Sequence, residues 1–314
     1  MTKSLAILTV LFAATLAAAR PTNVVIAHRG ASAYAPENTL AAFRLAADQK
    51  ADYVEIDITF TRDGHLVVLH DDTLERTTDI EDVFPDRGRP ATAGSRSGER
   101  RWPIEDFTLE EVRRLDAGAW FDERFAGERI PTFEEAVDAI TARTGLLIEL
   151  KSPDKHRAAG RAMEPLVADV LRARNLAGAS GAQDHPRIIV QSFDEGGVRE
   201  LAKLLPDVPR VLLFSSPAAP RWTGASGLKE VASFATGIGP NKDILDKDPK
   251  LAERAHDLGL FVFAWTYRAE STAEQDAARA AMQRGLTILG LDGVITDNPD
   301  LGRRQASGGN RPQA

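Results

Sequence analysis

Residues 53–70 read YVEIDITFTRDGHLVVLH, two apolar runs joined by the dipeptide Asp63-Gly64. An Asp-Gly pair between two apolar runs favours a tight β-hairpin. Because side chains alternate along a strand, the apolar residues of the first run share one face, and Glu55 and Asp57 share the other. The stretch therefore predicts an antiparallel hairpin whose first strand carries two carboxylates on one face.

The turn also predicts a register for this hairpin. If Arg62 and His65 flank the turn, Asp57 lies directly opposite His70 on the second strand. Directly opposed residues share a face of the sheet. We therefore expect a carboxylate and an imidazole in one site.

Outside the hairpin, short apolar runs alternate with segments of helical spacing along the 314 residues. Alternating β and α segments are typical of a parallel sheet, and about eight strands in a chain of this length indicate closure into a barrel. We expect an α/β fold, a somewhat irregular (β/α)8 TIM barrel over residues 20–301 that contains the hairpin. Further strands are expected at 24–27, 145–150, 187–191, 208–214, 234–238, 260–265 and 293–295, and helices include 39–48 and 163–173.

Two capping boxes mark expected helix starts, Thr108 with Glu111 and Thr132 with Glu135. Between the hairpin and the second box lies an expected insertion at about 77–125. Its first part is polar and charged without periodicity, which leaves a lid over the site or a solvated loop, and we favour the loop.

Both ends of the chain differ from the barrel in composition. A lysine, an apolar run and three alanines make residues 1–19 typical of a signal peptide, and the run is short for a membrane anchor. This predicts export to the periplasm or the medium, with cleavage near Ala19. The polar, Gly-rich segment 302–314 is expected to be a disordered tail.

Composition excludes several classes of function. The net charge of −7 disfavours nucleic acid as a partner. The chain has no cysteine, which excludes thiol catalysis, zinc–thiolate sites and a lipid on an N-terminal cysteine. No apolar run after the signal is long enough for a spanning helix, so we expect no stable membrane insertion.

Three carboxylates are the main candidates for metal binding. Glu55 and Asp57 would point into the barrel, where unpaired charge is costly and a cation would relieve their repulsion; an ordinary solvated edge strand is the alternative. Glu149 ends another strand, where active sites of such barrels lie. The three would form an oxygen-only site suited to Mg²⁺ or Ca²⁺. Lys151 shares the face of Glu149, either to hold a phosphate oxygen or as a simple surface pair.

Two histidines follow expected strands. His28-Arg29-Gly30 comes after 24–27, and His70 ends the hairpin. An imidazole exchanges protons near neutral pH, Arg29 has donors suited to phosphate, and Gly30 permits close approach of the backbone to a ligand. Two imidazoles beside an oxygen-liganded metal indicate acid–base cleavage of a phosphodiester.

These residues belong to a longer series of motifs. In order they are His28-Arg29-Gly30, Pro36-Glu37-Asn38-Thr39, Glu55-Ile56-Asp57, Asp63-Gly64, His70-Asp71, 130–135, Glu149-Leu150-Lys151, Gln191-Ser192-Phe193, Trp265-Thr266 and 293–299. The ordered set resembles the glycerophosphodiester phosphodiesterase family, of the phosphoinositide-phospholipase-C-like barrel superfamily, over residues 24–300. Tyr267-Arg268 depart from the hydrophobic residue and Asn that many relatives have after Trp-Thr.

The resemblance implies roles for the candidate residues. Those matching Glu55, Asp57 and Glu149 bind one divalent cation, Ca²⁺ or Mg²⁺. Those matching His28 and His70 are the general acid and base, in an order that the sequence leaves open.

Four further residues are implied at the substrate. Arg29 and Lys151 would contact the phosphate, and Glu37 would lie near the metal or the glycerol. Trp265 would form an apolar wall for the glycerol, with a plain core tryptophan as the alternative. For Asn38 we favour a purely local role as the N-cap of the following helix.

The function implied is metal-dependent hydrolysis of glycerophosphodiesters, small-molecule substrates, to sn-glycerol 3-phosphate and an alcohol such as choline, ethanolamine or glycerol. Water, or the 2-hydroxyl of the glycerol by way of a cyclic phosphate, would be the nucleophile. The alternatives are a lysophospholipase D or phosphoinositide-type phosphodiesterase on the same barrel, a non-catalytic exported binding protein, and a carboxylate–metal barrel that acts on carbon acids. The last lacks the catalytic lysine or second acid set that we would expect.

Overall fold

A computed structural model describes residues 21–90, 100–178 and 187–306 of the chain. The expected signal peptide, residues 1–19, lies outside the described residues, so export stays a prediction. Within the described residues, no helix has both the length and the apolar character needed to cross a membrane.

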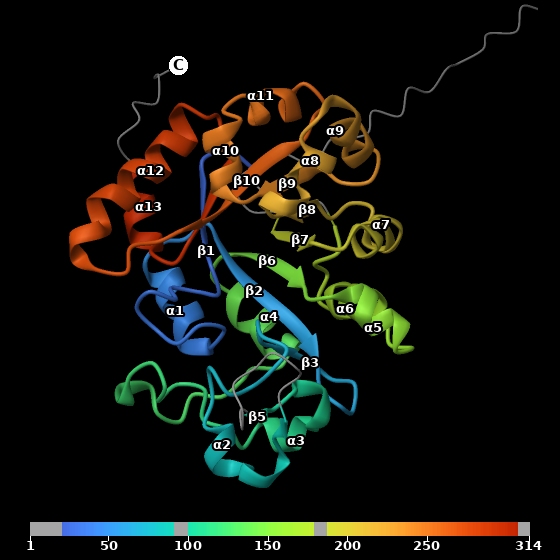
Figure 1. The fold of residues 1–314 in the computed structure, drawn as a ribbon, viewed down its shortest axis with the longest axis vertical. Helices are drawn as coiled ribbons and strands as arrows, with labels where there is room; N and C mark the ends of the chain where they lie inside the picture. The colour runs from blue at the N-terminus through green and yellow to red at the C-terminus, as the bar shows by residue number, and fades with distance from the viewer. Residues whose placement is uncertain (1–20, 91–99, 179–186, 307–314) are drawn as a thin grey trace, which may run out of the picture.

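In this part of the chain, eight parallel strands close into a barrel, with a ninth strand, β3 (Leu66–Val68), antiparallel to β2 (Figure 1). β1 pairs with both β2 and β11, and this double pairing closes the cylinder. The expected (β/α)8 barrel is thus confirmed. The barrel strands are β1 (Val24–Ala27), β2 (Tyr53–Phe60), β6 (Gly145–Leu150), β7 (Ile188–Ser192), β8 (Arg210–Phe214), β9 (Gly237–Pro240), β10 (Phe261–Tyr267) and β11 (Gly293–Thr296).

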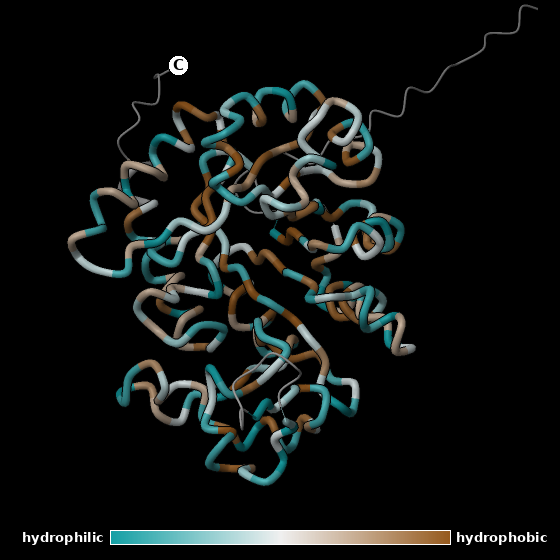
Figure 2. The backbone as a smooth tube through the Cα atoms, viewed as in Figure 1, coloured by the Kyte–Doolittle hydropathy of each residue, from teal (hydrophilic) through white to brown (hydrophobic). Residues whose placement is uncertain are grey.

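Helices lie around the barrel (Figure 1), and hydrophobic and hydrophilic residues both occur along them (Figure 2). An amphipathic helix buries its apolar stripe against the core. In α4, for example, Phe133, Val137 and Ile140 are buried. The longer helices are α1 (Leu40–Asp48), α4 (Phe133–Thr141), α6 (Glu164–Ala173), α7 (Glu195–Leu204), α9 (Ala225–Ala232), α12 (Gln275–Thr287) and α13 (Pro299–Ala306). Shorter ones are α5 (Pro153–Ala158), α8 (Ala219–Trp222), α10 (Lys242–Lys247) and α11 (Leu251–His256).

The barrel interior changes character along its axis. Apolar side chains such as Val24, Leu147 and Phe263 form one buried cluster inside it. Two to four residues further along the strands, on the same face, the side chains become polar. The mouth at the carboxyl ends of the strands is therefore where charged groups gather, as in other barrels of this kind.

β2 changes partners along its length. Its start pairs with β1 at Tyr53, whereas its last three residues pair with β3 (Leu66–Val68). The hairpin therefore leads from the barrel to the inserted segment (Figure 1).

The hairpin forms, but its predicted register is wrong by one residue. Asp57 lies opposite Leu69, whose N–H donates to the Asp57 carbonyl (3.0 Å), and not opposite His70. The reason is a longer turn, closed by Thr61 and His65, whose N–H to O distance is 3.0 Å. The glycine of this turn has φ +87°, as expected for a three-residue loop with a bulge.

The segment between β3 and α4 is a small folded unit with its own core. Ile80, Trp102 and Phe107 are buried in it. The favoured interpretation of residues 77–101 as a solvated loop is wrong where they are described; 91–99 lie outside the described residues. Its elements are α2 (Ile80–Val83), β4 (Arg89–Pro90), β5 (Arg100–Arg101) and α3 (Leu109–Val112). Both predicted capping boxes are present, at α3 and α4.

Two further expectations need correction. The strand expected at 234–238 begins at Gly237, because Phe234 belongs to the turn after α9 and its N–H donates to Val231 (3.0 Å). The tail expected to be disordered from Gly302 is helical through Ala306. Gly302 is buried beside Val25 of β1, so packing on the barrel extends this helix.

Candidate active site

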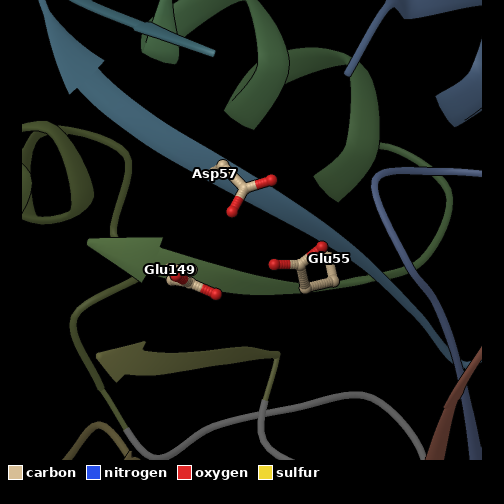
Figure 3. Close-up of side chains that lie close together, drawn as sticks. All are labelled: Glu55, Asp57 and Glu149. Carbon is tan, nitrogen blue, oxygen red and sulfur yellow. The ribbon is translucent and has the colours of Figure 1, made fainter. Parts of the chain in front are cut away.

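Three carboxylates converge at the mouth of the barrel (Figure 3). Glu55 and Asp57 come from β2 and Glu149 from β6, and one oxygen of each lies within 4.8 Å of the others. All three are buried. The convergence follows from register, because Asp57 pairs with Glu149 in the parallel β2–β6 ladder and Glu55 lies on the same face two residues earlier.

Two cationic side chains offset part of this charge. Nζ of Lys151 lies 2.8 Å from Oε1 of Glu149 and 3.5 Å from Oδ1 of Asp57. Nε of Arg29 lies 3.3 Å from Oδ2 of Asp57, and its backbone N–H donates to Glu55 (2.9 Å). Three ionised carboxylates less two cations leave a net charge of −1.

Burial and mutual repulsion oppose full ionisation of the cluster. Burial raises the pKa of Glu55 well above its usual value, and Asp57 and Glu149 raise it further. Burial and then Asp57 also raise the pKa of Glu149. For Asp57, burial acts in the same direction, but Lys151 and Arg29 outweigh it and lower the pKa. The cluster therefore favours a shared proton, or a cation in its place.

The donor set fits a divalent cation. Carboxylate oxygens are the hard ligands that Ca²⁺ and Mg²⁺ prefer. A cation among them would also cancel the excess negative charge, which is costly at a buried site. The buried triad Glu55, Asp57 and Glu149 is thus suited to a divalent metal.

The turn after β1 places Arg29 beside the triad. Arg29 has φ +55° and Gly30 has φ +87°. A Cβ on Gly30 would lie 2.7 Å from the carbonyl carbon of Ala42 in α1. The close approach of α1 therefore requires a glycine at this position.

Asn38 contacts the triad directly. Its Nδ2 donates to Oδ2 of Asp57 (3.0 Å), and its Oδ1 accepts the backbone N–H of Asp57 (3.4 Å). The prediction that Asn38 is the N-cap of α1 is wrong, because Thr39 is the N-cap and accepts the N–H of Ala42 (3.3 Å). The left-handed φ of Asn38, +58°, accompanies this different use of the side chain.

Glu37 is linked to the triad through Arg29. Its Oε1 accepts a hydrogen bond from Nη1 of Arg29 (2.8 Å), and both of its oxygens accept from Arg76. Burial opposes ionisation of Glu37, but Arg76 and Arg29 outweigh it and lower the pKa. Glu37 is therefore a carboxylate between two guanidinium groups.

His28 is paired with a carboxylate from the other end of the chain. Its Nδ1 lies 2.6 Å from Oδ1 of Asp297, which follows β11. Burial alone would raise the pKa of Asp297, but the hydrogen bond from His28 outweighs it and lowers the pKa. Since the ionised Asp297 accepts, Nδ1 carries the proton and Nε2 is left for proton exchange.

His70 has the same arrangement with Asp71. Nδ1 of His70 lies 2.6 Å from Oδ1 of Asp71. Burial opposes ionisation of Asp71, but His70 and Arg76 outweigh it and lower the pKa. His70 lies beyond the end of β3 and still reaches the site, where its charge helps to lower the pKa of Asp57. Carboxylate and imidazole thus share one site although the register that predicted this is wrong.

A cavity of about 100 Å³ brings these groups together. Trp265 is partly exposed in its wall, its indole N–H donates to the carbonyl of Gly239 (2.7 Å), and its ring packs edge-on to Phe193 at 5.5 Å. The lining residues are His28, Arg29, Glu55, His70, Glu149, Lys151, Gln191, Phe193, Leu213, Trp265, Thr266 and Ile295.

Gln191, Asp297 and Arg76 are among the residues of the site that received no role from the sequence. Gln191 is buried and its Nε2 donates to Glu55 (3.3 Å), while its Oε1 has no hydrogen-bond partner among the described residues. Asp297 follows a strand end directly, a signal that could have pointed to it. Arg76 lies in a turn beyond β3, and nothing in the sequence ties it to the site.

A parallel barrel with a buried acidic triad and two imidazole–carboxylate pairs at its mouth has the properties of a hydrolase that moves protons beside a metal. The profile of the Glycerophosphoryl diester phosphodiesterase family matches residues 28–301, and the chain belongs to this family. It is an enzyme of this kind, a phosphodiesterase that acts on glycerophosphodiesters.

Relatives and solved structures agree with this assignment. A glycerophosphodiester phosphodiesterase of Bacillus subtilis is 32% identical over 287 residues, 88% of this chain and 84% of the relative. One of Caldanaerobacter subterraneus is 33% identical over 279 residues, 88% and 95% of the two chains. An Oleispira antarctica phosphodiesterase, solved with the product sn-glycerol 3-phosphate, has a TM-score of 0.68 and 26% identity, over 91% of this chain and 97% of that one.

Proposed function

We propose that the chain converts glycerophosphodiesters into an alcohol and sn-glycerol 3-phosphate, with His28 and His70 as the proton-transfer groups. The observation that carries the proposal is one cavity that holds both imidazoles, each with a carboxylate on Nδ1, next to a buried acidic triad. The O. antarctica phosphodiesterase with bound sn-glycerol 3-phosphate supports the same product.

In the proposed reaction the chain's cations hold the substrate. The guanidinium of Arg29 and the ammonium of Lys151 bind phosphate oxygens, and Glu37 fixes the orientation of Arg29. A Ca²⁺ or Mg²⁺ held by the acidic triad would neutralise charge on those oxygens.

Proton transfer is divided between the two imidazoles. One removes a proton from the nucleophile, which is water or the 2-hydroxyl of the glycerol, and the other protonates the departing alcohol oxygen. Because Asp297 and Asp71 each hold one Nδ1, both rings act through Nε2. Attack by the 2-hydroxyl gives a cyclic phosphate, which water then opens.

The glycerol part is held by groups of two kinds. Trp265 forms the apolar wall against its carbons. The buried Oε1 of Gln191 accepts a hydrogen bond from one of its hydroxyls, since a buried acceptor without a donor is costly.

The test is hydrolysis of glycerophosphocholine by the purified protein, stripped of metal and then supplied with Ca²⁺ or Mg²⁺. We expect choline and sn-glycerol 3-phosphate only when a cation is present. His28→Ala and His70→Ala should each lower kcat by a factor of about 100 to 10,000 while circular dichroism stays unchanged, because each removes a proton-transfer group. Full activity of both variants would refute the proposed roles.

A second candidate substrate class is supported by the rim of the cavity. Phe193 is 47% exposed beside Trp265, so an apolar group could lie against it. A lysophospholipid would place its acyl chain there and be cleaved by the same centre. Release of choline from lysophosphatidylcholine with a higher kcat/KM than from glycerophosphocholine would assign the chain to this class.

A further inference from the structure

We propose that Arg76 is a positioning residue that holds His70 and Arg29 in one fixed arrangement. The inference rests on the proposed function of these two residues. Arg76 joins two carboxylates: Nε lies 2.5 Å from Oδ2 of Asp71 and Nη2 lies 3.2 Å from Oδ1. On its other side, Nη1 lies 2.8 Å and Nη2 lies 2.7 Å from the oxygens of Glu37.

Each of these carboxylates holds one group of the site. Asp71 accepts from Nδ1 of His70 (2.6 Å), and Glu37 accepts from Nη1 of Arg29 (2.8 Å). The series His70, Asp71, Arg76, Glu37, Arg29 therefore runs without a break from the proton-transfer group to the phosphate-binding group, and from Asp71 to Arg29 its charges alternate in sign. We call it the Arg76 bridge. It fixes the two groups relative to each other although they come from different strand ends.

The inserted unit fixes the backbone of Arg76. Leu74, two residues before it, is fully buried in the core of that unit, and its N–H donates to the carbonyl of Trp102 (3.0 Å). Thr78, two residues after it, is also buried, and its hydroxyl donates to the carbonyl of Leu74 (2.7 Å). The core of the insertion thus determines the geometry of the site through Arg76.

Only an arginine suits this place. A planar guanidinium presents several donors in fixed directions and can bind two carboxylates at once, whereas an ammonium is a point charge. Without Arg76, Glu37 would keep Arg29 as its one cationic partner in this series. Glu37 would then compete with the substrate phosphate for Arg29. Asp71 would keep His70 but lose the contact that orients its own carboxylate.

The experiment compares Arg76→Ala, Arg76→Lys and a matched control, Arg113→Ala. The control is matched because the two side chains are similarly exposed, Arg113 at 42% and Arg76 at 44%, and Arg113 also pairs with a carboxylate, that of Glu135. We expect Arg76→Ala to lower kcat about 100-fold, the cost typical of misplaced reacting groups, and Arg76→Lys to cause a smaller loss. Added guanidinium should restore part of the activity of Arg76→Ala and none in Arg113→Ala, because the exposed side chain leaves an accessible gap.

A second readout does not depend on turnover. The Nδ1 proton of a histidine bound to a carboxylate gives a separate NMR signal. Arg76→Ala should shift the signal of His70 and leave that of His28, which pairs with Asp297, unchanged. Arg113→Ala should shift neither.

The outcomes separate this inference from the proposed function. Wild-type kcat in Arg76→Ala, or a loss without guanidinium rescue and with an unchanged His70 signal, would refute the Arg76 bridge. If Arg76→Ala does not fold, Arg76→Lys provides the test. A wild-type kcat and an unchanged His70 signal in Arg76→Lys would refute the claim that a guanidinium is needed at this position. Should the unaltered enzyme prove inactive, the proposed function fails, and the NMR comparison still tests the geometry.

Discussion

Asn38 illustrates how a single side chain can fix a carboxylate of the triad. Its Nδ2 donates to Oδ2 of Asp57 (3.0 Å), and its Oδ1 accepts the backbone N–H of Asp57 (3.4 Å). Hydrogen bonds of this kind orient a metal-binding carboxylate and select which of its oxygens faces the ion. The residue therefore belongs to the proposed cation site although it contributes no carboxylate.

We predict that Asn38→Ala weakens cation affinity about 10- to 100-fold, the usual cost of losing such a contact. Isothermal titration with Ca²⁺ measures this directly. The control is Asn175→Ala at the end of α6, because Asn175 has φ +57°, almost the φ of +58° at Asn38, so that both variants carry the same backbone strain. An equal loss of affinity in both variants would contradict the role of Asn38.

At the scale of elements, the approach of α1 to the turn after β1 sets the place of Arg29. Gly30 makes this possible because a Cβ there would lie 2.7 Å from two atoms of Ala42. Such a distance requires the helix or the turn to move. Any movement of this turn also moves Arg29, the residue next to it.

Gly30→Ala and Gly64→Ala separate steric clash from backbone strain. Both glycines have φ +87°, but nothing lies within 4 Å of a Cβ on Gly64. We predict that Gly64→Ala lowers the free energy of unfolding by about 1–2 kcal/mol, the cost of a left-handed non-glycine residue. Gly30→Ala should cost clearly more and also raise KM, because Arg29 moves. Urea unfolding measures the free energy of unfolding of both variants. An equal decrease in the two would show that α1 can move away from the turn without a further cost.

At the scale of the whole molecule, the barrel gathers excess negative charge in a place that water reaches poorly. Burial and mutual repulsion raise the pKa values of Glu55 and Glu149. The folded, metal-free protein therefore holds protons that the unfolded chain has released. This contribution to stability is present below the ordinary carboxylate pKa and is lost as pH rises through the raised values. Asp57, with a lowered pKa, acts in the opposite sense at lower pH.

We predict that Ca²⁺ raises Tm more at about pH 8 than at about pH 5. At the lower pH the cation must displace the proton that the carboxylates of the triad share. Differential scanning calorimetry at fixed Ca²⁺ concentration measures both shifts. Glu149→Gln removes one charge of the triad and should reduce the shift at the higher pH. The same shift at both pH values, in the unaltered protein, would exclude proton–cation competition at this site.

Much of the site was predictable because its residues follow local rules. The two-residue alternation of β2 put Glu55 and Asp57 on one face, and the strand end put Glu149 at the same level. Asn38 was misassigned because asparagine before a helix usually caps it, and only its left-handed backbone directs it elsewhere. The register of the hairpin was missed because the choice between a two- and a three-residue turn depends on Thr61, whose hydroxyl accepts the N–H of His65 (3.0 Å).

The barrel and the set of polar residues at its mouth could be predicted from the sequence, since strand alternation and the order of the motifs are encoded along the chain. The partner of each group depends on how distant parts of the chain meet in the folded protein. His28 meets Asp297 across 269 residues, and Arg76 meets Glu37 across 39. Such pairs form when the barrel closes and the inserted unit packs its apolar residues. Local sequence patterns do not predict them, because the two partners are far apart in the chain and meet only in the folded structure.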